Sequence, residues 1–402
     1  MAICPKRPIS LKWRLPNCLA PSNKRAVVFA LAFLALLSLL LTLWQWVVTW
    51  PFPLHQRVKD RDYVPPVTLL KPLKGWDEKT HDCLGSWLKQ DYGGAVQVLM
   101  GVSSPHDPAV EGVSQLIKAY PGCNAQLVLC EESLGVNAKV STLIQLLRQA
   151  RNEIIVVSDA DVFVAPDYLL NAVAPLRDPE IGLVNSFYRL ANPATVAMRC
   201  EAIAINADFW SQVLQGRSMQ PLDFALGAVM VTRREQLAKI GGFEALADYL
   251  ADDFQLGNRI VRTGKSIALC PVVVDCFSPP MGWPEVWSHQ LRWSRTIRAC
   301  KPLPYAFSIL SNATFWPLLW LLARPVPGVL AMFGICVLVR MVMALALQKR
   351  LAPMGRSGLY AWLVPVKDLL QFALWLLAFF GNHIEWRGQQ YRLLRDGKLV
   401  RS

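Results

Sequence analysis

The chain has 402 residues, of which 53% are hydrophobic, and a net charge of +13. This hydrophobic content is high for a soluble protein and points to membrane segments, while the length leaves room for one large domain beside them. The ten cysteines include no Cys-x-x-Cys pair and no Cys/His group at zinc spacing, which argues against a disulfide framework or a zinc site. Reduced thiols favour a domain that faces the cytoplasm.

A basic tail precedes an uncharged apolar run. Residues 1–25 hold six lysines and arginines and no acid, which is typical of a membrane-surface contact or a topology signal rather than of nucleic-acid binding. Residues 26–48 carry no charge over 23 positions, whereas about 20 residues suffice to cross a bilayer. Because Trp44, Trp46 and Trp50 follow where a signal peptide would have small residues, the run is predicted to be a retained anchor.

The C-terminal part of the chain is also apolar and predicts about three transmembrane helices. Arg340, Lys367 and Asp368 fall inside these apolar stretches, where charges are expensive. They are expected to snorkel or to form a structural Arg–Asp pair, and an acceptor-site role is the alternative. The three apolar stretches are 305–323, 325–347 and 358–380.

The expected protein is a multi-pass membrane protein with one globular domain. The basic tail would by the positive-inside tendency lie in the cytoplasm and place that domain outside. The chemistry predicted below needs a cytoplasmic donor, so we expect the catalytic domain in the cytoplasm. The predicted segments are a basic tail (1–25), an anchor (26–48), a globular domain (51–300), a membrane region (301–380) and a basic C-terminal tail (381–402).

Within the globular region, short apolar runs alternate with helical patterns. This alternation predicts βαβ units and a mostly parallel α/β sheet, in which ligands bind beyond the carboxyl ends of the strands. The predicted strands are 66–71, 95–102, 125–131, 153–159 and 181–187, and the predicted helices between them are 77–91, 107–119, 136–150 and 166–177.

The sequence "SDADV" follows the fourth predicted strand. Asp159 and Asp161 are alternate residues, so on an extended strand their side chains point the same way. Two carboxylates at a strand end suit a hard divalent cation whose shell is completed by phosphate oxygens. The alternative is a turn in which an aspartate caps the next helix.

A second acidic cluster lies in "ADYLADDFQLGNRI", residues 247–260. Asp252 and Asp253 fall in the first turn of a helix predicted over 251–263, where backbone N–H groups are expected to lower their pKa. A carboxylate kept ionised there could act as a base toward a hydroxyl. Asp248 is predicted to be a cap or a loop anchor.

The third motif is "WSHQLRWSRTIR", residues 287–298. Arg292, Arg295 and Arg298 recur every three residues and predict one basic ridge with Trp293 beside it. Arginine suits bidentate phosphate contacts, whereas a juxtamembrane helix would use the same ridge on anionic lipid. The spacing alone is compatible with both interpretations, a phosphate contact and a lipid contact.

Together these motifs resemble the ceramide glucosyltransferase family, including its bacterial hopanoid-associated relatives, which have the GT-A fold. The resemblance covers residues from about 64 to 393. It is carried by "VTLLKPLKG" (67–75), "LGVNAKVSTL" (134–143), "SDADV" (158–162), "GGFEALADYLADDFQLG" (241–257), "HQLRW" (289–293) and "EWRGQQYRL" (385–393).

The resemblance implies an inverting glycosyltransferase that moves a sugar from a UDP-sugar, most simply UDP-glucose, to a lipid hydroxyl such as that of ceramide. A hopanoid polyol acceptor with transfer of N-acetylglucosamine is the alternative. A processive polysaccharide synthase is less favoured, because these spans are few for a secretion channel. A non-catalytic membrane protein on the same scaffold also stays open.

The resemblance further implies roles for single residues. Asp253 would be the general base, with Asp252 beside it in the catalytic site. Asp159 would contact the nucleotide and, with Asp161, hold Mg²⁺ or Mn²⁺. The remaining implied residues are Lys71, Asp107, Lys139 and Arg292 on the donor side, and His289 and Trp293 on the acceptor side.

Two positions depart from the family pattern. Ser104 stands where the family has the first aspartate of an Asp-x-x-Asp-Pro-Ala motif, while Asp107 is kept. A serine cannot supply that charge, which puts the nucleotide contacts there in doubt. His289 replaces the glutamine of the Gln-x-x-Arg-Trp motif.

Overall fold

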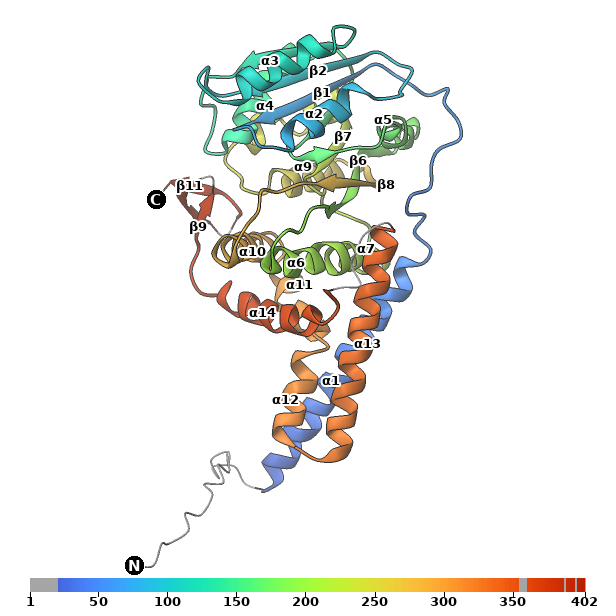
Figure 1. The fold of residues 1–402 in the computed structure, drawn as a ribbon, viewed down its shortest axis with the longest axis vertical. Helices are drawn as coiled ribbons and strands as arrows, with labels where there is room; N and C mark the ends of the chain where they lie inside the picture. Colours follow the sequence, from blue (N-terminus) through green and yellow to red (C-terminus); the bar gives the residue numbers. More distant parts are fainter. Residues whose placement is uncertain (1–20, 354–359, 387, 395, 402) are drawn as a thin grey trace, which may run out of the picture.

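A computed structural model describes residues 21–353, 360–386, 388–394 and 396–401. Residues 1–20 of the predicted basic tail (1–25) lie outside the described part of the chain. An α/β domain sits at one end of the molecule and a bundle of long apolar helices at the other (Figure 1). The eight cysteines within the described residues are free thiols.

One eight-stranded sheet, in the order β3-β2-β1-β4-β7-β6-β8-β5, forms the domain. The pairs β1–β2, β2–β3, β1–β4 and β6–β8 are parallel, whereas β7 runs antiparallel to its neighbours β4 and β6. The mostly parallel α/β sheet is therefore confirmed. The strands are β1 (Val67–Leu73), β2 (Val96–Val102), β3 (Asn124–Leu129), β4 (Ile154–Ser158), β5 (Val162–Phe163), β6 (Ile181–Leu190), β7 (Val229–Arg233) and β8 (Ser266–Cys276).

Helices cover both faces of this sheet. Leu69 of β1 belongs to an apolar cluster with α2, α3 and α5, whereas the next residue, Leu70, packs with α4 and α9 on the other face. Because both faces of the sheet are buried, the strands are continuously apolar and do not alternate between apolar and polar residues. The covering helices are α2 (Thr80–Leu88), α3 (Ala109–Ala119), α4 (Ala138–Gln149), α5 (Tyr168–Val173, continued by Ala174–Arg177), α8 (Arg234–Lys239) and α9 (Asp252–Arg262).

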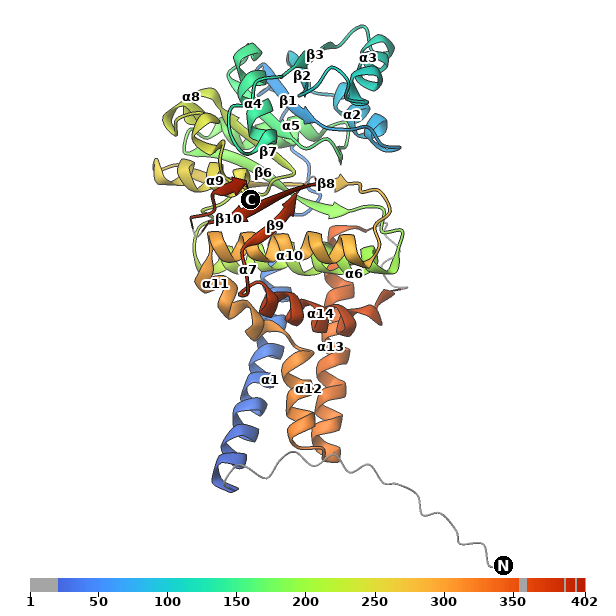
Figure 2. The same ribbon diagram turned by 90° about the vertical axis from the view of Figure 1, so that its left-hand side faces the viewer.

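A layer of helices lies crosswise between the sheet and the long helices (Figure 2). Its side chains pack against β6 and β8 above and against the long helix α13 below, in one apolar cluster. Residues Ala204–Phe209 within it are π-helical, a local irregularity that is frequent at functional sites. The layer consists of α6 (Val196–Ile203), the π-helical turn η2 (Ala204–Phe209), α7 (Trp210–Met219), α10 (Trp283–Cys300) and α14 (Leu363–Leu377).

Two helices, α1 (Pro21–Thr49) and α13 (Pro327–Leu351), are long and apolar enough to cross a membrane. The helices Pro302–Ser311 and Phe315–Ala323, bent by 57°, make a third span if they count as one. The predicted anchor is thus a spanning-type helix, but the described residues of the C-terminal half supply one or two such spans where the sequence predicts about three. The stretch 358–380 instead contains the crosswise α14, whose 15 residues reach only about 22 Å.

A small antiparallel sheet closes the chain. Its strands β9 (His383–Trp386), β10 (Gln389–Leu393) and β11 (Leu399–Arg401) lie in the segment that the sequence assigns to a basic tail. Tyr391 and Leu399 are buried in a cluster with Val136 and Leu250, which precede α4 and α9. The end of the chain is therefore folded back onto the acidic loop of the domain.

Candidate active site

Three charged side chains from distant parts of the chain meet at the carboxyl end of β4. Lys139, in the first turn of α4, places its Nζ 2.8 Å from Asp159 Oδ1 and 3.2 Å from Asp252 Oδ2. Burial alone would lower the pKa of Lys139, but the charges of Asp159 and Asp252 outweigh it and raise that pKa. Lys139 therefore stays a cation and holds the two carboxylates together.

Asn137 fixes Lys139 in this position. Its Oδ1 accepts hydrogen bonds from the backbone N–H groups of Lys139 (3.0 Å) and Val140 (3.2 Å), the usual geometry of a helix N-cap. Its Nδ2 donates to the carbonyl of Tyr249 at 2.7 Å. One amide side chain thus both starts α4 and ties it to the acidic loop.

The acidic loop is anchored on its other side by Asp248. Its Oδ1 accepts from the N–H of Val136 at 3.1 Å, and its carbonyl accepts from the N–H of Leu399 at 2.7 Å. Gly135 packs so closely that an added Cβ would lie 2.5 Å from the Cβ of Ala247. The prediction that Asp248 anchors a loop is confirmed.

Asp253 is a half-buried carboxyl group in the first turn of α9, next to the buried Asp252. Its Oδ1 accepts from the N–H of Phe254 at 2.7 Å. Burial raises the pKa of Asp253 to about 7, the charge of Asp252 adds to this, and Lys139 and the Phe254 N–H oppose it. The prediction that the helix start lowers this pKa is wrong, because desolvation and the neighbouring carboxylate outweigh the N–H groups. A carboxyl group with a pKa near 7 is well matched to general-base chemistry.

Asp159 and Asp161 form the second acidic pair, just beyond β4. Burial raises the pKa of Asp161 to about 6 and the charge of Asp159 adds to it, while Lys71 and Lys139 oppose the rise. The pair therefore has an excess of negative charge that a divalent cation would relieve, and its oxygen donors suit Mg²⁺ or Mn²⁺. Within the described residues, no group of three or more His, Cys, Asp or Glu side chains could hold a metal, so other ligands would have to complete the shell.

Lys71 and Asp107, both predicted on the donor side, support loops at this edge. Lys71 is fully buried in β1, and its Nζ donates to Ser158 Oγ at 3.1 Å and to the carbonyl of Asp159. Asp107 Oδ1 accepts from the N–H groups of Gly75 and Ala109, each at 2.9 Å. Lys71 thus lies beneath the aspartate pair, and Asp107 joins two loops. A direct contact of either side chain with the sugar donor remains a prediction.

Helix α10 carries the predicted acceptor-side residues. His289 Nδ1 lies 2.6 Å from Glu201 Oε1, which also accepts a hydrogen bond from Gln290 Nε2 at 2.8 Å. The rings of His289 and Trp293 are 4.8 Å apart. The side chain of Glu201 on α6 therefore fixes one face of α10, and Trp293 follows one turn later.

Two of the three arginines predicted to form one ridge on α10 contact the C-terminal segment. Arg295 donates to the backbone carbonyls of His383 and Phe380, and the Arg298 guanidinium lies 6.0 Å from the ring of Phe379. Two of the three cations therefore support the C-terminal segment. Arg292 is partly buried one position before Trp293, and its predicted diphosphate contact remains a prediction.

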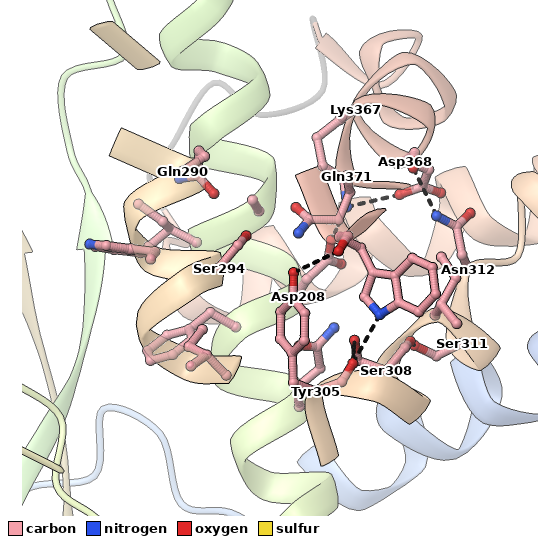
Figure 3. A pocket seen from close by; sticks show the side chains of 18 of the residues that line it. Asp208, Gln290, Ser294, Tyr305, Ser308, Ser311, Asn312, Lys367, Asp368 and Gln371 are labelled. Carbon is pink, nitrogen blue, oxygen red and sulfur yellow. Dashed lines mark hydrogen bonds and ion pairs between the residues drawn. The ribbon is translucent and has the colours of Figure 1, made fainter. Parts of the chain in front are cut away.

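Trp293 also lines a cavity of about 140 Å³ between the crosswise helices and the long helices. Figure 3 shows polar side chains from several elements converging on it, among them Gln290, Ser294 and Gln371. Its wall contains a buried ion network in which Arg340 lies 2.9 Å from both Asp208 and Asp368, and Lys367 pairs with the same two carboxylates. The predicted Arg–Asp pair is confirmed, and it is part of a larger network.

Sequence reasoning missed three residues near the cavity or the acidic site, namely Glu201, Asp208 and Tyr188. Glu201 and Asp208 are single acids in an apolar stretch, and a buried acid needs a partner, which is a signal that could have found them. Burial raises the pKa of the Tyr188 hydroxyl, and the charges of Asp253 and Asp159 add to the rise. Tyr188 therefore lies within electrostatic reach of the acidic site, and no sequence pattern marks it.

The sheet order, with the aspartate pair after β4 and the acidic start of α9, defines the GT-A fold. The fold is similar to that of a mannosyltransferase from Pyrobaculum calidifontis, PcManGT, solved in complex with GDP-Man and Mn²⁺. The TM-score is 0.53 at 22% identity, over 89% of this chain and 99% of that chain. This likeness concerns the fold alone.

The chain matches glycosyl transferase family 21 over residues 27–399 and belongs to that family. It is 27% identical over 221 residues to ceramide glucosyltransferase 3 of Caenorhabditis elegans and 26% identical over 227 residues to ceramide glucosyltransferase 1 of the same organism. Each match covers 54% of this chain and 47% of the relative, so the chain spans about half the length of these curated relatives. The resemblance read from the motifs is confirmed.

Proposed function

We propose that the protein is a membrane-bound inverting glycosyltransferase that moves glucose from UDP-glucose to a hydroxyl group of a lipid such as ceramide. The observation that carries the proposal is Asp253, a half-buried carboxyl group with a pKa of about 7 next to the Lys139–Asp159–Asp252 cluster. Membership of family 21 and the likeness to ceramide glucosyltransferases support the sugar and the acceptor class.

In this proposal, Asp253 takes the proton of the acceptor hydroxyl as its oxygen attacks the anomeric carbon of the sugar. The bond from that carbon to the diphosphate breaks on the opposite face, so the configuration inverts. Arg292 binds the diphosphate and Lys139 keeps Asp159 and Asp252 in place. Asp159 and Asp161 would hold Mg²⁺ or Mn²⁺, which supplies positive charge toward the leaving diphosphate.

The proposed arrangement in the membrane follows from the layers of the fold. The long helices span the bilayer, the crosswise layer lies at its surface, and the α/β domain is in the cytoplasm, where UDP-sugars are available. The acceptor would reach Asp253 from the membrane side, past Trp293 and His289. Its lipid chains would stay in the bilayer.

The proposal is tested with the purified full-length protein in lipid nanodiscs. It is incubated with UDP-glucose, UDP-N-acetylglucosamine or UDP-glucuronic acid and with ceramide or a hopanoid polyol, and the lipid products are identified by mass spectrometry. We expect glucosylceramide with Mg²⁺ or Mn²⁺ and none in EDTA. An N-acetylglucosaminyl hopanoid would support the alternative acceptor, and the absence of any glycolipid would contradict the proposal. Activity undiminished in EDTA would contradict the metal site at Asp159 and Asp161.

A further inference from the structure

The cavity of about 140 Å³ lies where the long helices meet the crosswise layer. Thr42 and Gln45 of the spanning-type helix α1 line it, together with Asn312 and Tyr305 from the bent pair. Polar residues in a spanning helix usually face protein or a functional cavity rather than lipid. The position is therefore that of a head group whose chains extend into the bilayer.

The charged groups in the cavity wall neutralise one another. Arg340 and Lys367 are each paired with both Asp208 and Asp368, and Asp368 Oδ2 also accepts from Thr314 Oγ1 at 2.8 Å. Two cations and two anions leave no net charge in this network. A charged ligand would have to break these buried pairs, which is costly, so the cavity suits an uncharged ligand.

The remaining polar lining consists of amide and hydroxyl groups. Gln290, Gln371 and Asn312 supply amides, and Ser294 and Ser308 supply hydroxyls. Figure 3 shows these labelled side chains around the same space. Groups of this kind both donate and accept hydrogen bonds, so they suit a ligand with hydroxyl or amide groups.

A buried acceptor adjoins this lining. Glu201 is 3% exposed and lines a second cavity of about 30 Å³ that shares Gln290, Lys367 and Gln371 with the first. Its Oε1 is occupied by His289 and Gln290, whereas its Oε2 has no hydrogen-bond partner within the described part of the chain. A buried carboxylate oxygen needs a donor, and an N–H or O–H group of a ligand would supply one.

A row of aromatic rings runs from the cavity toward strand β6 of the sheet. The ring centroids of Trp293 and Phe209, which both line the cavity, are 6.4 Å apart, and Phe209 lies 5.4 Å from Tyr188. Tyr188 in turn lies within electrostatic reach of Asp253. The row of rings thus extends from the cavity to Tyr188 of β6.

From these observations we propose that the cavity between α10, η2 and α14 binds the head group of the acceptor lipid, and that this head group is uncharged and carries both hydroxyl and N–H groups. The inference rests on the proposed function, because only that function makes the bound lipid the acceptor of the sugar. The geometry itself requires only a neutral, hydrogen-bonding head group at the membrane surface.

The test is photo-crosslinking of the full-length protein in nanodiscs without UDP-sugar, using a short-chain ceramide with a diazirine near its amide. Peptide mapping should find the label on α10 and α14, and excess unlabelled ceramide should remove it. Phosphatidylserine, which is anionic, should not compete. Label found only outside the cavity, or equal competition by phosphatidylserine, would overturn the inference.

The variant Gln371→Leu should weaken crosslinking and raise KM for ceramide by roughly fivefold, as expected for one lost hydrogen bond, with KM for UDP-glucose unchanged. The matched control is Gln115→Leu, the same change at an exposed position of α3. Equal behaviour of the two variants would contradict the site, provided that both have the wild-type melting temperature.

The crosslinking experiment and the transfer experiment distinguish a failure of the proposed site from a failure of the proposed function. Label in the cavity without any transfer of sugar would contradict the proposed glucosyltransferase function and leave a ceramide site. Transfer to ceramide with label only outside the cavity would leave that function and refute the site.

Discussion

Asp253 is the residue on which the proposed chemistry depends most directly. Asparagine keeps the shape of the side chain and can still accept the hydrogen bond from Phe254 N–H, but it cannot take a proton. We expect Asp253→Asn to lose roughly 10³-fold in kcat, within the range that general-base catalysis supplies, while UDP still binds. Transfer rates and calorimetric titration with UDP check this. Wild-type turnover in the variant would refute the assignment of the base.

The pH dependence of transfer follows from the same carboxyl group. A general base must be deprotonated, and the pKa of Asp253 is raised to about 7, so kcat/KM should rise with pH through about 7 and level off above it. Lys139 lowers the pKa of Asp253, so Lys139→Gln should move this rise to higher pH.

The control for this shift is Lys79→Gln, which removes an exposed cation paired with Asp82. Its profile should match that of the wild type, because exposed charges are screened by solvent. A rise at the same pH in Lys139→Gln as in the wild type would show that Asp253 is not the titrating base.

Much of the acidic site was predictable from residues, but its electrostatics were not. The positions of Asp252 and Asp253 in a first helical turn follow from the sequence. Lys139 contacts a residue more than a hundred positions away, and only the fold brings the two together. The raised pKa of Asp253 depends on burial by other elements, so the helix-start argument alone gives the opposite sign.

Among the elements, the junction of α13, α14 and η2 depends on its buried ion network. Asp368→Asn would leave Arg340 and Lys367 with Asp208 as the only carboxylate of the network. Leaving a buried charge without its partner typically costs about 3–5 kcal/mol, so we expect a clear loss of stability. Thermal unfolding in detergent measures it. Asp82→Asn, which breaks an exposed pair, is the control and should change little.

The C-terminal sheet supports the loop that leads into α9. Tyr391→Ala would open the cluster that contains Leu250 and Leu399, and Leu399 N–H holds the carbonyl of Asp248. We expect kcat to fall about tenfold with little change in KM for the donor, because the base is misplaced while the nucleotide side is kept. Val400→Ala, an exposed position of β11, is the control. Equal kinetics of the two variants would contradict a supporting role.

The sequence predicted the strands and helices of the domain better than the elements near its end. Uninterrupted apolar strands such as Ile154–Ser158 have a strong pattern, because both faces are buried. The stretch 358–380 is as apolar as a span, yet α14 lies crosswise, because Lys367 and Asp368 pair with residues of α13 and η2. The strands of residues 383–401 are three to five residues long, too short for a period-2 pattern to stand out from a basic tail.

On the scale of the whole molecule, each of the three layers contains a different feature. The sheet carries the acidic site, the crosswise helices carry the polar cavity, and the long helices at the far end are apolar enough to cross a membrane (Figures 1 and 2). The sequence predicts the first and third layers from apolar patterns. The middle layer could not be predicted in this way. Its helices have apolar faces toward both the sheet and α13, so their apolar patterns do not distinguish them from spanning helices.

In the proposed function, the orientation of these layers in the membrane decides which pool of nucleotide sugar the acidic site meets. The start of α1 and the connection between α12 (Phe315–Ala323) and α13 lie together at the end of the bundle farthest from the sheet. Gly328, near that connection, and Gly122, in the domain, both have open space where a Cβ would be added, so each tolerates a cysteine. We expect a membrane-impermeant maleimide on sealed right-side-out vesicles to label Gly328→Cys above the wild-type background, and Gly122→Cys only after permeabilisation. The reverse pattern would place the domain outside, as the basic tail alone suggests, and would contradict a cytoplasmic UDP-sugar as donor.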